Sequence, residues 1–340
     1  MKVAIVGAGN FGTAIANIVA KNGFPAYLWM RDPAQLADMR AHRENRRYLK
    51  GHPLDDNVVP SGDLAESVGA ADVLFVTVPS ASFRQVTRDV AAHAKPGAFA
   101  VSGTKGVESD GFRLMSQILD ELLPECGTGV ISGPNLAEEI AGAHFTGTVV
   151  ASRSPDLRAA VQRVLASPTL RVYSSADVYG VELGGALKNV YAIICGMAAA
   201  LEVGQNTVAM LITRSLAEMS RFAVSLGANP FTFLGLAGVG DLMVTCTSPL
   251  SRNFQLGFRV GKGNTLEEAM EQLGRLAEGV NTLRVIRAKT TELGIYMPLV
   301  EGLHRVLYEG YGIGQVVNDL MTSEQMVDVE FASPETWSAA

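Results

Sequence analysis

The stretch Lys2-Val3-Ala4-Ile5-Val6-Gly7-Ala8-Gly9-Asn10-Phe11-Gly12 joins an apolar run of strand length to glycines with the spacing G-x-G-x-x-G. In such a loop Gly7 allows a tight turn, Gly9 lets the backbone approach a diphosphate, and Gly12 lets the next helix pack on the strand. The N-terminus of that helix supplies free N–H groups and a partial positive charge. An ordinary glycine turn is the alternative, but a helical stretch and the strand-like Ala26–Met30 follow in order. The stretch therefore predicts an α/β fold that binds a dinucleotide.

The first half of the chain continues this alternation of strand-length and helical runs. The apolar runs of strand length are Lys2–Val6, Ala26–Met30, Val73–Val78, Ala98–Ser102, Val130–Ser132, Thr148–Ala151 and Leu170–Tyr173. The stretches with helical periodicity are Thr13–Lys21, Ser82–His93, Arg113–Leu122 and Pro155–Ala166. Strands that alternate with helices indicate βαβ units and a parallel sheet. We expect a Rossmann-like dinucleotide-binding domain over residues 1–180.

After about Ala176 the strand signals stop and helical patterns take over. These patterns cover Val181–Glu202, Thr207–Leu226, Leu266–Leu273, Thr282–Leu293, Pro298–Tyr308 and Gly314–Met321, and glycine-rich breaks are expected at Gly235–Gly240 and Gly257–Gly263. We expect an all-helical substrate-binding domain over residues 181–330, with the site in the cleft between the two domains. Residues 331–340, rich in small polar residues, are expected to form a flexible tail.

Composition excludes several classes of partner. The chain has 28 Lys and Arg against 34 Asp and Glu, a net charge of −6, so no overall positive field attracts nucleic acid or anionic lipid. An anionic substrate must then be held by a local cluster of donors. Cys126, Cys195 and Cys246 are too widely spaced to predict a disulfide framework or a zinc site, and no metal site is expected from the histidines.

Two segments bear on the compartment. The N-terminus has no charged region, apolar stretch and cleavage site in sequence, so it does not read as a signal peptide. The apolar segment Leu183–Leu201 is interrupted by Lys188 and Asn189, and the run after them is shorter than the roughly 20 residues that span a bilayer. We expect a buried helix there, and a cytoplasmic enzyme with no stable membrane insertion.

Cofactor choice depends on the end of the second predicted strand. NAD-binding proteins commonly place a carboxylate there for the ribose 2′-hydroxyl, whereas this chain has Trp29-Met30-Arg31-Asp32. Pairing of Arg31 with a 2′-phosphate favours NADPH (NADP) over NADH (NAD). In the alternative interpretation, Arg31 is a solvated loop charge and Asp32 is the N-cap of a helix that begins at Pro33.

A lysine interrupts the most apolar helical stretch, Leu183-Gly184-Gly185-Ala186-Leu187-Lys188-Asn189-Val190. Burial of an ammonium group is costly unless it is paired, and desolvation lowers the pKa of a lysine toward neutrality. Such an amine can exchange a proton with a reacting alcohol or ketone near pH 7. A lysine that extends to the surface from a buried helix is the alternative. The pattern predicts that Lys188 is catalytic.

Further polar patches are expected in loops near the same cleft. They are Thr104-Lys105-Gly106, Gly133-Pro134-Asn135, Gly240-Asp241 and Ser251-Arg252-Asn253. Arg252 is a candidate phosphate ligand because a guanidinium group matches phosphate oxygens in a bidentate fashion. Each patch alone also fits turn or capping chemistry, and Asp241 is equally a candidate helix N-cap. Together with a buried lysine, the patches predict a small anionic carbonyl substrate.

Several longer motifs carry a more specific resemblance. They are GAGNFGTA from Gly7, SGTKGVE around Lys105, SGPNLAEE around Asn135, VELGGALKNV around Lys188, ITRSLAEM, GLAGVGDLMVTCTSPLSRN from Gly235 to Asn253, and AEGVNT around Glu278. Over essentially its whole length the chain resembles bacterial NAD(P)-dependent glycerol-3-phosphate dehydrogenases. The resemblance implies an oxidoreductase that reduces dihydroxyacetone phosphate to sn-glycerol 3-phosphate for glycerophospholipid synthesis. It also implies that the protein is a homodimer.

The resemblance also implies roles for individual residues, with Lys188 as proton donor and acceptor, assisted by Asp241 and Lys105. The implied substrate contacts are Lys105, Gly133, Asn135, Lys188, Asp241, Ser251, Arg252 and Asn253. The implied cofactor contacts are Gly7, Gly9, Asn10, Phe11, Gly12, Arg31, Lys105, Ala137, Arg252, Leu276 and Glu278. Two positions depart from the family pattern, which usually has Ser or Thr in place of Asn135 and often Trp in place of Phe11.

Two other functions are compatible with parts of the sequence. A β-hydroxyacid dehydrogenase also joins a dinucleotide-binding domain to a helical one around a lysine, but typically places its asparagine one helical turn beyond that lysine. Here Asn189 is adjacent to Lys188. A non-catalytic dinucleotide sensor is the alternative from another class, and it would need neither Lys188 nor the polar cluster Ser251–Asn253.

Overall fold

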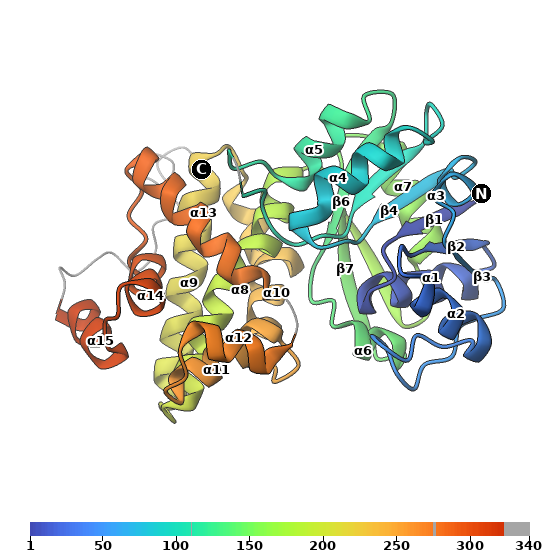
Figure 1. Cartoon of the computed structure of the whole chain (residues 1–340). Coiled ribbons are helices and arrows are strands. Elements are labelled where there is room, and N and C mark those ends of the chain that lie inside the picture. The colour runs from blue at the N-terminus through green and yellow to red at the C-terminus, as the bar shows by residue number, and fades with distance from the viewer. Residues whose placement is uncertain (110, 275–276, 323–340) are drawn as a thin grey trace. The chain divides into compact units, whose positions relative to one another are not determined.

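The computed structural model describes residues 1–109, 111–274 and 277–322, and these form two compact units (Figure 1). The first unit contains Met1–Glu108 and Arg113–Glu182. The second unit runs from Leu183 onward and also includes Ser109 and Phe112. The predicted tail, residues 331–340, lies outside the described residues.

The first unit is built on one sheet with the strand order β3-β2-β1-β4-β5-β6-β7-β8 among the described residues. The strands are β1 (Val3–Val6), β2 (Ala26–Trp29), β3 (Val58–Ser61), β4 (Val73–Val76), β5 (Phe99–Ser102), β6 (Gly127–Ser132), β7 (Thr146–Ala151) and β8 (Leu170–Ser175). The helices are α1 (Asn10–Lys21), α2 (Pro33–His42), α3 (Leu64–Val68), α4 (Ser80–Ala91), α5 (Met115–Leu122), α6 (Ala137–Ala141) and α7 (Pro155–Leu165). The order places β1 and β4 side by side at the centre, as a dinucleotide-binding fold requires.

Helices cover both faces of this sheet because successive side chains of each strand point to opposite faces. Val3 and Ile5 of β1 belong to a buried cluster with α1, α2 and α7. Ala4 and Val6 of the same strand belong to a second cluster with α3, α4 and α5. Strands buried on both faces are continuous apolar runs, which is why the sequence revealed most of them.

The prediction of a parallel sheet is correct except for one pair of strands. Strand β7 runs antiparallel to β6, with Val130 opposite Ala151, and parallel to β8. The five-residue helix α6 reverses the chain between β6 and β7, so no full crossover forms there. The prediction also missed the edge strand β3, which contains Pro60. Proline is tolerated at a sheet edge, so its presence weakens the strand signal without preventing the strand.

The second unit is helical throughout its described part. Its elements are α8 (Val178–Ala200), α9 (Gln205–Ser225), a 3-10 helix (Pro230–Leu234), a π-helix (Leu236–Gly240), α10 (Asp241–Thr247), α11 (Arg252–Gly261), α12 (Leu266–Leu273), α13 (Glu278–Leu293), α14 (Pro298–Tyr308) and α15 (Ile313–Thr322). Helix α8 begins in the first unit and carries the chain into the second. It is long and apolar enough to cross a membrane, but 89% of its most apolar window is buried inside the protein. It is therefore a core helix.

Glycines allow α8 and α11 to pack backbone against backbone. A Cβ atom at Gly257 of α11 would collide with the carbonyl oxygen of Ile193, and one at Gly196 of α8 would collide with that of Phe254. The prediction of a break at Gly257–Gly263 is therefore wrong for residues 257–261. Gly257 and Gly261 lie inside α11, and Gly257 brings this helix close to α8. The predicted break at Gly235–Gly240 coincides with the π-helix.

Candidate active site

The dinucleotide loop has the conformation that its glycine spacing predicts. Gly7 has a φ of 118°, which favours glycine. A Cβ atom at Gly12 would collide with the carbonyl oxygen of Gly7, so this glycine permits the close packing of α1 on β1. Gly9 precedes the first residue of α1, and no atom lies within 4 Å of the place where its Cβ would be. The loop thus leaves open space at the helix N-terminus, where a diphosphate fits.

The residues after β2 differ in their surroundings. Asp32 is the N-cap of α2, and its Oδ1 accepts hydrogen bonds from the backbone N–H groups of Ala34 (2.9 Å) and Gln35 (3.4 Å). Arg31 is exposed and makes no hydrogen bond or ion pair with the residues that the structure describes. The capping alternative for Asp32 is therefore confirmed, and it leaves Arg31 accessible to a ligand.

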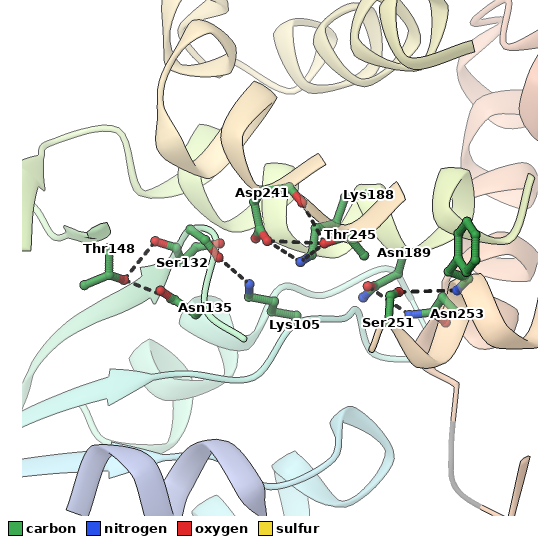
Figure 2. Close-up of polar contacts among 12 residues, drawn as sticks. Lys105, Ser132, Asn135, Thr148, Lys188, Asn189, Asp241, Thr245, Ser251 and Asn253 are labelled. Atoms are coloured by element: carbon green, nitrogen blue, oxygen red, sulfur yellow. Dashed lines mark hydrogen bonds and ion pairs between the residues drawn. The ribbon is translucent and has the colours of Figure 1, made fainter. Parts of the chain in front are cut away.

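Lys105 and the loop after β6 are held together within the first unit (Figure 2). The Nζ of Lys105 donates to the carbonyl oxygen of Gly133 at 2.9 Å. Asn135 Nδ2 donates to Thr148 Oγ1 at 2.9 Å, and that hydroxyl donates to the carbonyl oxygen of Ser132 at 3.1 Å. The Oδ1 of Asn135 is buried and has no hydrogen-bond partner within the described residues. It can accept a hydrogen bond from a ligand that enters here.

Lys188 forms a buried polar cluster with two residues of α10 (Figure 2). Lys188 is only 6% exposed, and Asp241 is fully buried. The Nζ donates to Asp241 Oδ1 in an ion pair and to Thr245 Oγ1 at 2.6 Å. Lys188 is therefore not a lysine that extends to the surface, and the Asp241 carboxylate compensates the charge of its ammonium group. Such an arrangement holds a proton at a fixed atom.

The predicted polar patch Ser251–Asn253 is the start of α11 rather than a loop. Ser251 is the N-cap, its Oγ accepting from the N–H of Phe254 at 3.3 Å. Asn253 Nδ2 donates to Asn189 Oδ1 at 3.0 Å, and Asn253 Oδ1 accepts from the N–H of Gly279 at 3.0 Å. Asn253 thus ties α8, α11 and α13 together. Asp241 is the first residue of α10, after the N-cap Gly240, so the alternative interpretation of Asp241 as a helix N-cap is wrong.

The other predicted residues lie at the starts of helices. Arg252 is exposed in the first turn of α11, and Glu278 is the half-buried first residue of α13. Asn10 and Phe11 open α1, and Ala137 opens α6. Leu276 lies outside the described residues.

Sequence reasoning missed Thr245, the second partner of the Lys188 amine. A signal for it exists, because Thr245 lies four residues after Asp241 and therefore on the same helix face. It also missed Thr148, which orients Asn135 from the neighbouring strand β7. No local pattern links those two positions.

Two buried glutamates accept hydrogen bonds from the first turns of helices. Glu182 accepts hydrogen bonds from the N–H (3.0 Å) and the hydroxyl of Ser116 in the first turn of α5. Glu218 accepts from the N–H groups of Leu299 (2.7 Å) and Val300 (3.4 Å) at the start of α14. Burial raises the pKa of each carboxyl to about 7, against the hydrogen bonds that lower it. Both titrate near neutral pH.

Comparison with known proteins identifies the family. Residues 2–158 match the model of the NAD-dependent glycerol-3-phosphate dehydrogenase N-terminus, and residues 177–318 match that of the C-terminus. A glycerol-3-phosphate dehydrogenase (NAD(P)+) from Pseudomonas putida is 58% identical over 333 residues, which are 97% of each chain. This chain belongs to the NAD-dependent glycerol-3-phosphate dehydrogenase family.

Solved structures agree with membership of this family of oxidoreductases. The glycerol-3-phosphate dehydrogenase of Coxiella burnetii has a TM-score of 0.91 at 34% identity, with 95% of this chain and 99% of that chain covered. The enzyme of the same name from Plasmodium falciparum has a TM-score of 0.88 at 25% identity, with 96% and 97% covered. Because the chain belongs to the glycerol-3-phosphate dehydrogenase family, the two alternative functions, a β-hydroxyacid dehydrogenase and a non-catalytic dinucleotide sensor, are wrong.

Proposed function

We propose that this chain reduces dihydroxyacetone phosphate to sn-glycerol 3-phosphate with NAD(P)H, and that Lys188 supplies the proton. Membership of the family supports the reaction. The observation that carries the role of Lys188 is the burial of its amine between Asp241 and Thr245. An amine held in this way and given access to the substrate is suited to general acid catalysis.

The dinucleotide loop fits the nicotinamide cofactor. The space left open at Gly9 and the N-terminus of α1 suit its diphosphate. When bound, the cofactor supplies a hydride to the carbonyl carbon. We also propose a preference for NADPH over NADH, because Arg31 is accessible and Asp32 is occupied as a helix cap. The further cofactor contacts we propose are Asn10, Phe11, Lys105, Ala137, Arg252 and Glu278.

Residues of the chain supply the proton in this proposal and hold the donor in position. Lys188 donates a proton from Nζ to the oxygen of the substrate as negative charge develops there. Asp241 and Thr245 fix the position of that amine before the reaction, so little reorganisation is needed. In the direction of oxidation, the same Nζ takes the proton from the alcohol.

We propose as substrate contacts the residues that the family resemblance implies. They are Lys105, Gly133, Asn135, Lys188, Asp241, Ser251, Arg252 and Asn253. Arg252 at the start of α11 is the proposed phosphate ligand, since the guanidinium and the helix N-terminus both favour an anion. Asn135 is the proposed acceptor for a substrate hydroxyl, through its unpartnered Oδ1.

The setting of the enzyme is also proposed from the family. We propose a cytoplasmic homodimer that provides glycerol 3-phosphate for glycerophospholipid synthesis, with no nucleic-acid partner. The net charge of −6 supports the last point. The buried state of α8 supports a chain without stable membrane insertion.

One assay tests the function. Purified protein is mixed with NADPH, or separately with NADH, and the fall in cofactor absorbance is followed after addition of dihydroxyacetone phosphate. Unphosphorylated dihydroxyacetone and keto acids such as 2-ketopantoate serve as control substrates. We expect rapid oxidation with the phosphorylated ketone alone. Equal rates with the unphosphorylated ketone, or no oxidation with either cofactor, would contradict the proposal.

A further inference from the structure

The carboxylate beside the dinucleotide loop has both of its oxygens engaged. Oδ1 of Asp32 caps α2, and Oδ2 accepts a hydrogen bond from Arg47 at 2.7 Å. A carboxylate that recognises NADH needs free oxygens for the ribose hydroxyls. Three hydrogen bonds already occupy the Asp32 carboxylate, so it has little acceptor capacity left for the ribose hydroxyls. Its negative charge, which would repel a 2′-phosphate, is compensated by Arg47.

Arg47 is held in place by a turn that is anchored to the dinucleotide loop. Asn45 is buried, and its Nδ2 donates to the carbonyl oxygen of Ala8 (3.0 Å) and to Thr13 Oγ1 (2.7 Å). The N–H of Leu49 donates to the carbonyl oxygen of Asn45 at 2.8 Å and closes the turn. Arg47 lies in the middle of this turn, beside the start of α2. Its position therefore depends on the loop that is expected to hold the cofactor.

The guanidinium of Arg47 retains capacity for a ligand. Its side chain is 59% exposed, and the contact with Asp32 is its one hydrogen bond within the described part of the chain. A guanidinium group has five N–H donors, so the others are available to an anion. Arg31, the residue before Asp32, is exposed as well. Two guanidinium groups are thus available next to one neutralised carboxylate.

We propose that Arg47 acts together with Arg31 as a specificity-determining residue that binds the 2′-phosphate of NADPH. This inference rests on the proposed dinucleotide binding and adds to it a residue 15 positions beyond Asp32 in the chain. Asp32 is the link between them, because it fixes the Arg47 guanidinium while it caps α2. The pairing also explains how a carboxylate at this position is compatible with a phosphorylated ribose.

The test uses two small probes with the full-length protein. Adenosine 2′,5′-bisphosphate carries the 2′-phosphate and adenosine 5′-monophosphate lacks it, and their dissociation constants are measured by titration calorimetry. We expect Arg47→Gln to weaken binding of the bisphosphate about tenfold, the usual effect of losing a charge-assisted hydrogen bond. Binding of the monophosphate should change less than twofold.

A matched control lies on the same turn. Arg46 is also exposed, but it pairs with Asp38 (3.4 Å) rather than Asp32. Arg46→Gln therefore removes the same charge, and we expect it to change both dissociation constants less than twofold. Arg47→Gln overturns the proposal if it leaves the bisphosphate unaffected, if it weakens both probes equally, or if it matches Arg46→Gln.

A second readout separates this inference from the proposed reaction. We expect Arg47→Gln to raise the KM for NADPH about tenfold relative to the KM for NADH, both measured with dihydroxyacetone phosphate. An equal rise in the KM values of both cofactors would contradict the role of Arg47 and leave the reaction established. Failure of the parent protein to reduce the ketone would contradict the proposed function, and the calorimetric comparison would still decide the role of Arg47.

Discussion

Lys188 and Asp241, 53 positions apart in the chain, form an ion pair that is almost completely shielded from solvent. Lys188 lies in α8 and Asp241 opens α10. Removal of two charges from water costs several kcal/mol per ion, so such a pair is weak evidence for a role in stability. Its presence next to a third polar partner, Thr245, is better explained by a need to hold a proton at a defined position.

Replacement of the lysine tests this explanation. We expect Lys188→Met to lower kcat by at least about 100-fold, the usual contribution of a general acid. Cofactor affinity should change less than about twofold, which also shows that the variant is folded. The unpaired Asp241 should lower the free energy of unfolding by about 3–5 kcal/mol. Exposed Lys262→Met is the control, and turnover close to that of the parent in Lys188→Met would remove the amine from the mechanism.

The proposed phosphate ligand can be tested within one helix. We expect Arg252→Ala to raise the KM for dihydroxyacetone phosphate by at least about tenfold, because a charge-assisted contact is lost. Arg259 lies two turns further along α11, where it donates to the carbonyl oxygen of Gln255. Arg259→Ala should leave the KM unchanged. If the two variants behave alike, the phosphate is held elsewhere.

Gly9 and Gly12 of the dinucleotide loop should respond differently to the same added methyl group. Gly12→Ala forces a Cβ against the carbonyl oxygen of Gly7, and we expect a loss of about 3 kcal/mol in the free energy of unfolding. Gly9→Ala meets no protein atom, so its stability should fall by no more than about 1 kcal/mol. We expect it instead to weaken NADPH binding about tenfold or more. Urea unfolding and cofactor titration measure the two effects, and the reverse order of stabilities would refute the assignment.

The buried glutamates predict a pH dependence of stability. The pKa of Glu182 is about 7 in the folded protein and 4.5 in its ordinary state, so between these values the folded protein retains a proton that the unfolded chain releases. The free energy of unfolding should therefore fall as pH rises from about 4.5 to about 7, by about 3 kcal/mol for this group. Glu218 should add a similar slope.

Neutral variants isolate that slope. We expect Glu182→Gln to reduce the fall in unfolding free energy between pH 5 and pH 7, measured by urea denaturation at each pH. The exposed Glu271→Gln should leave the profile unchanged. If Glu182→Gln keeps the pH profile of the parent protein, the folded state does not raise the pKa of Glu182.

Patterns that depend on neighbouring residues were readable in the sequence. The spacing of Gly7, Gly9 and Gly12 indicated the dinucleotide loop, and continuous apolar runs indicated most strands of the sheet. Lys188 was recognised because a charge inside an apolar helix is exceptional whatever surrounds it. The boundaries of α12 and α14 were also correct, since capping and periodicity are local.

Long-range packing decided the rest. Nothing near Lys188 in the chain specifies Asp241 and Thr245 as its partners, and nothing near Gly257 reveals that its missing side chain brings α11 onto α8. The antiparallel direction of β7 depends likewise on how a short helix returns the chain to the sheet. Local conformation follows from repeats of two or 3.6 residues, whereas partners are chosen when distant segments fold together. The chain order alone thus singled out the amine that we propose as the proton donor, and only the folded arrangement showed which groups surround it.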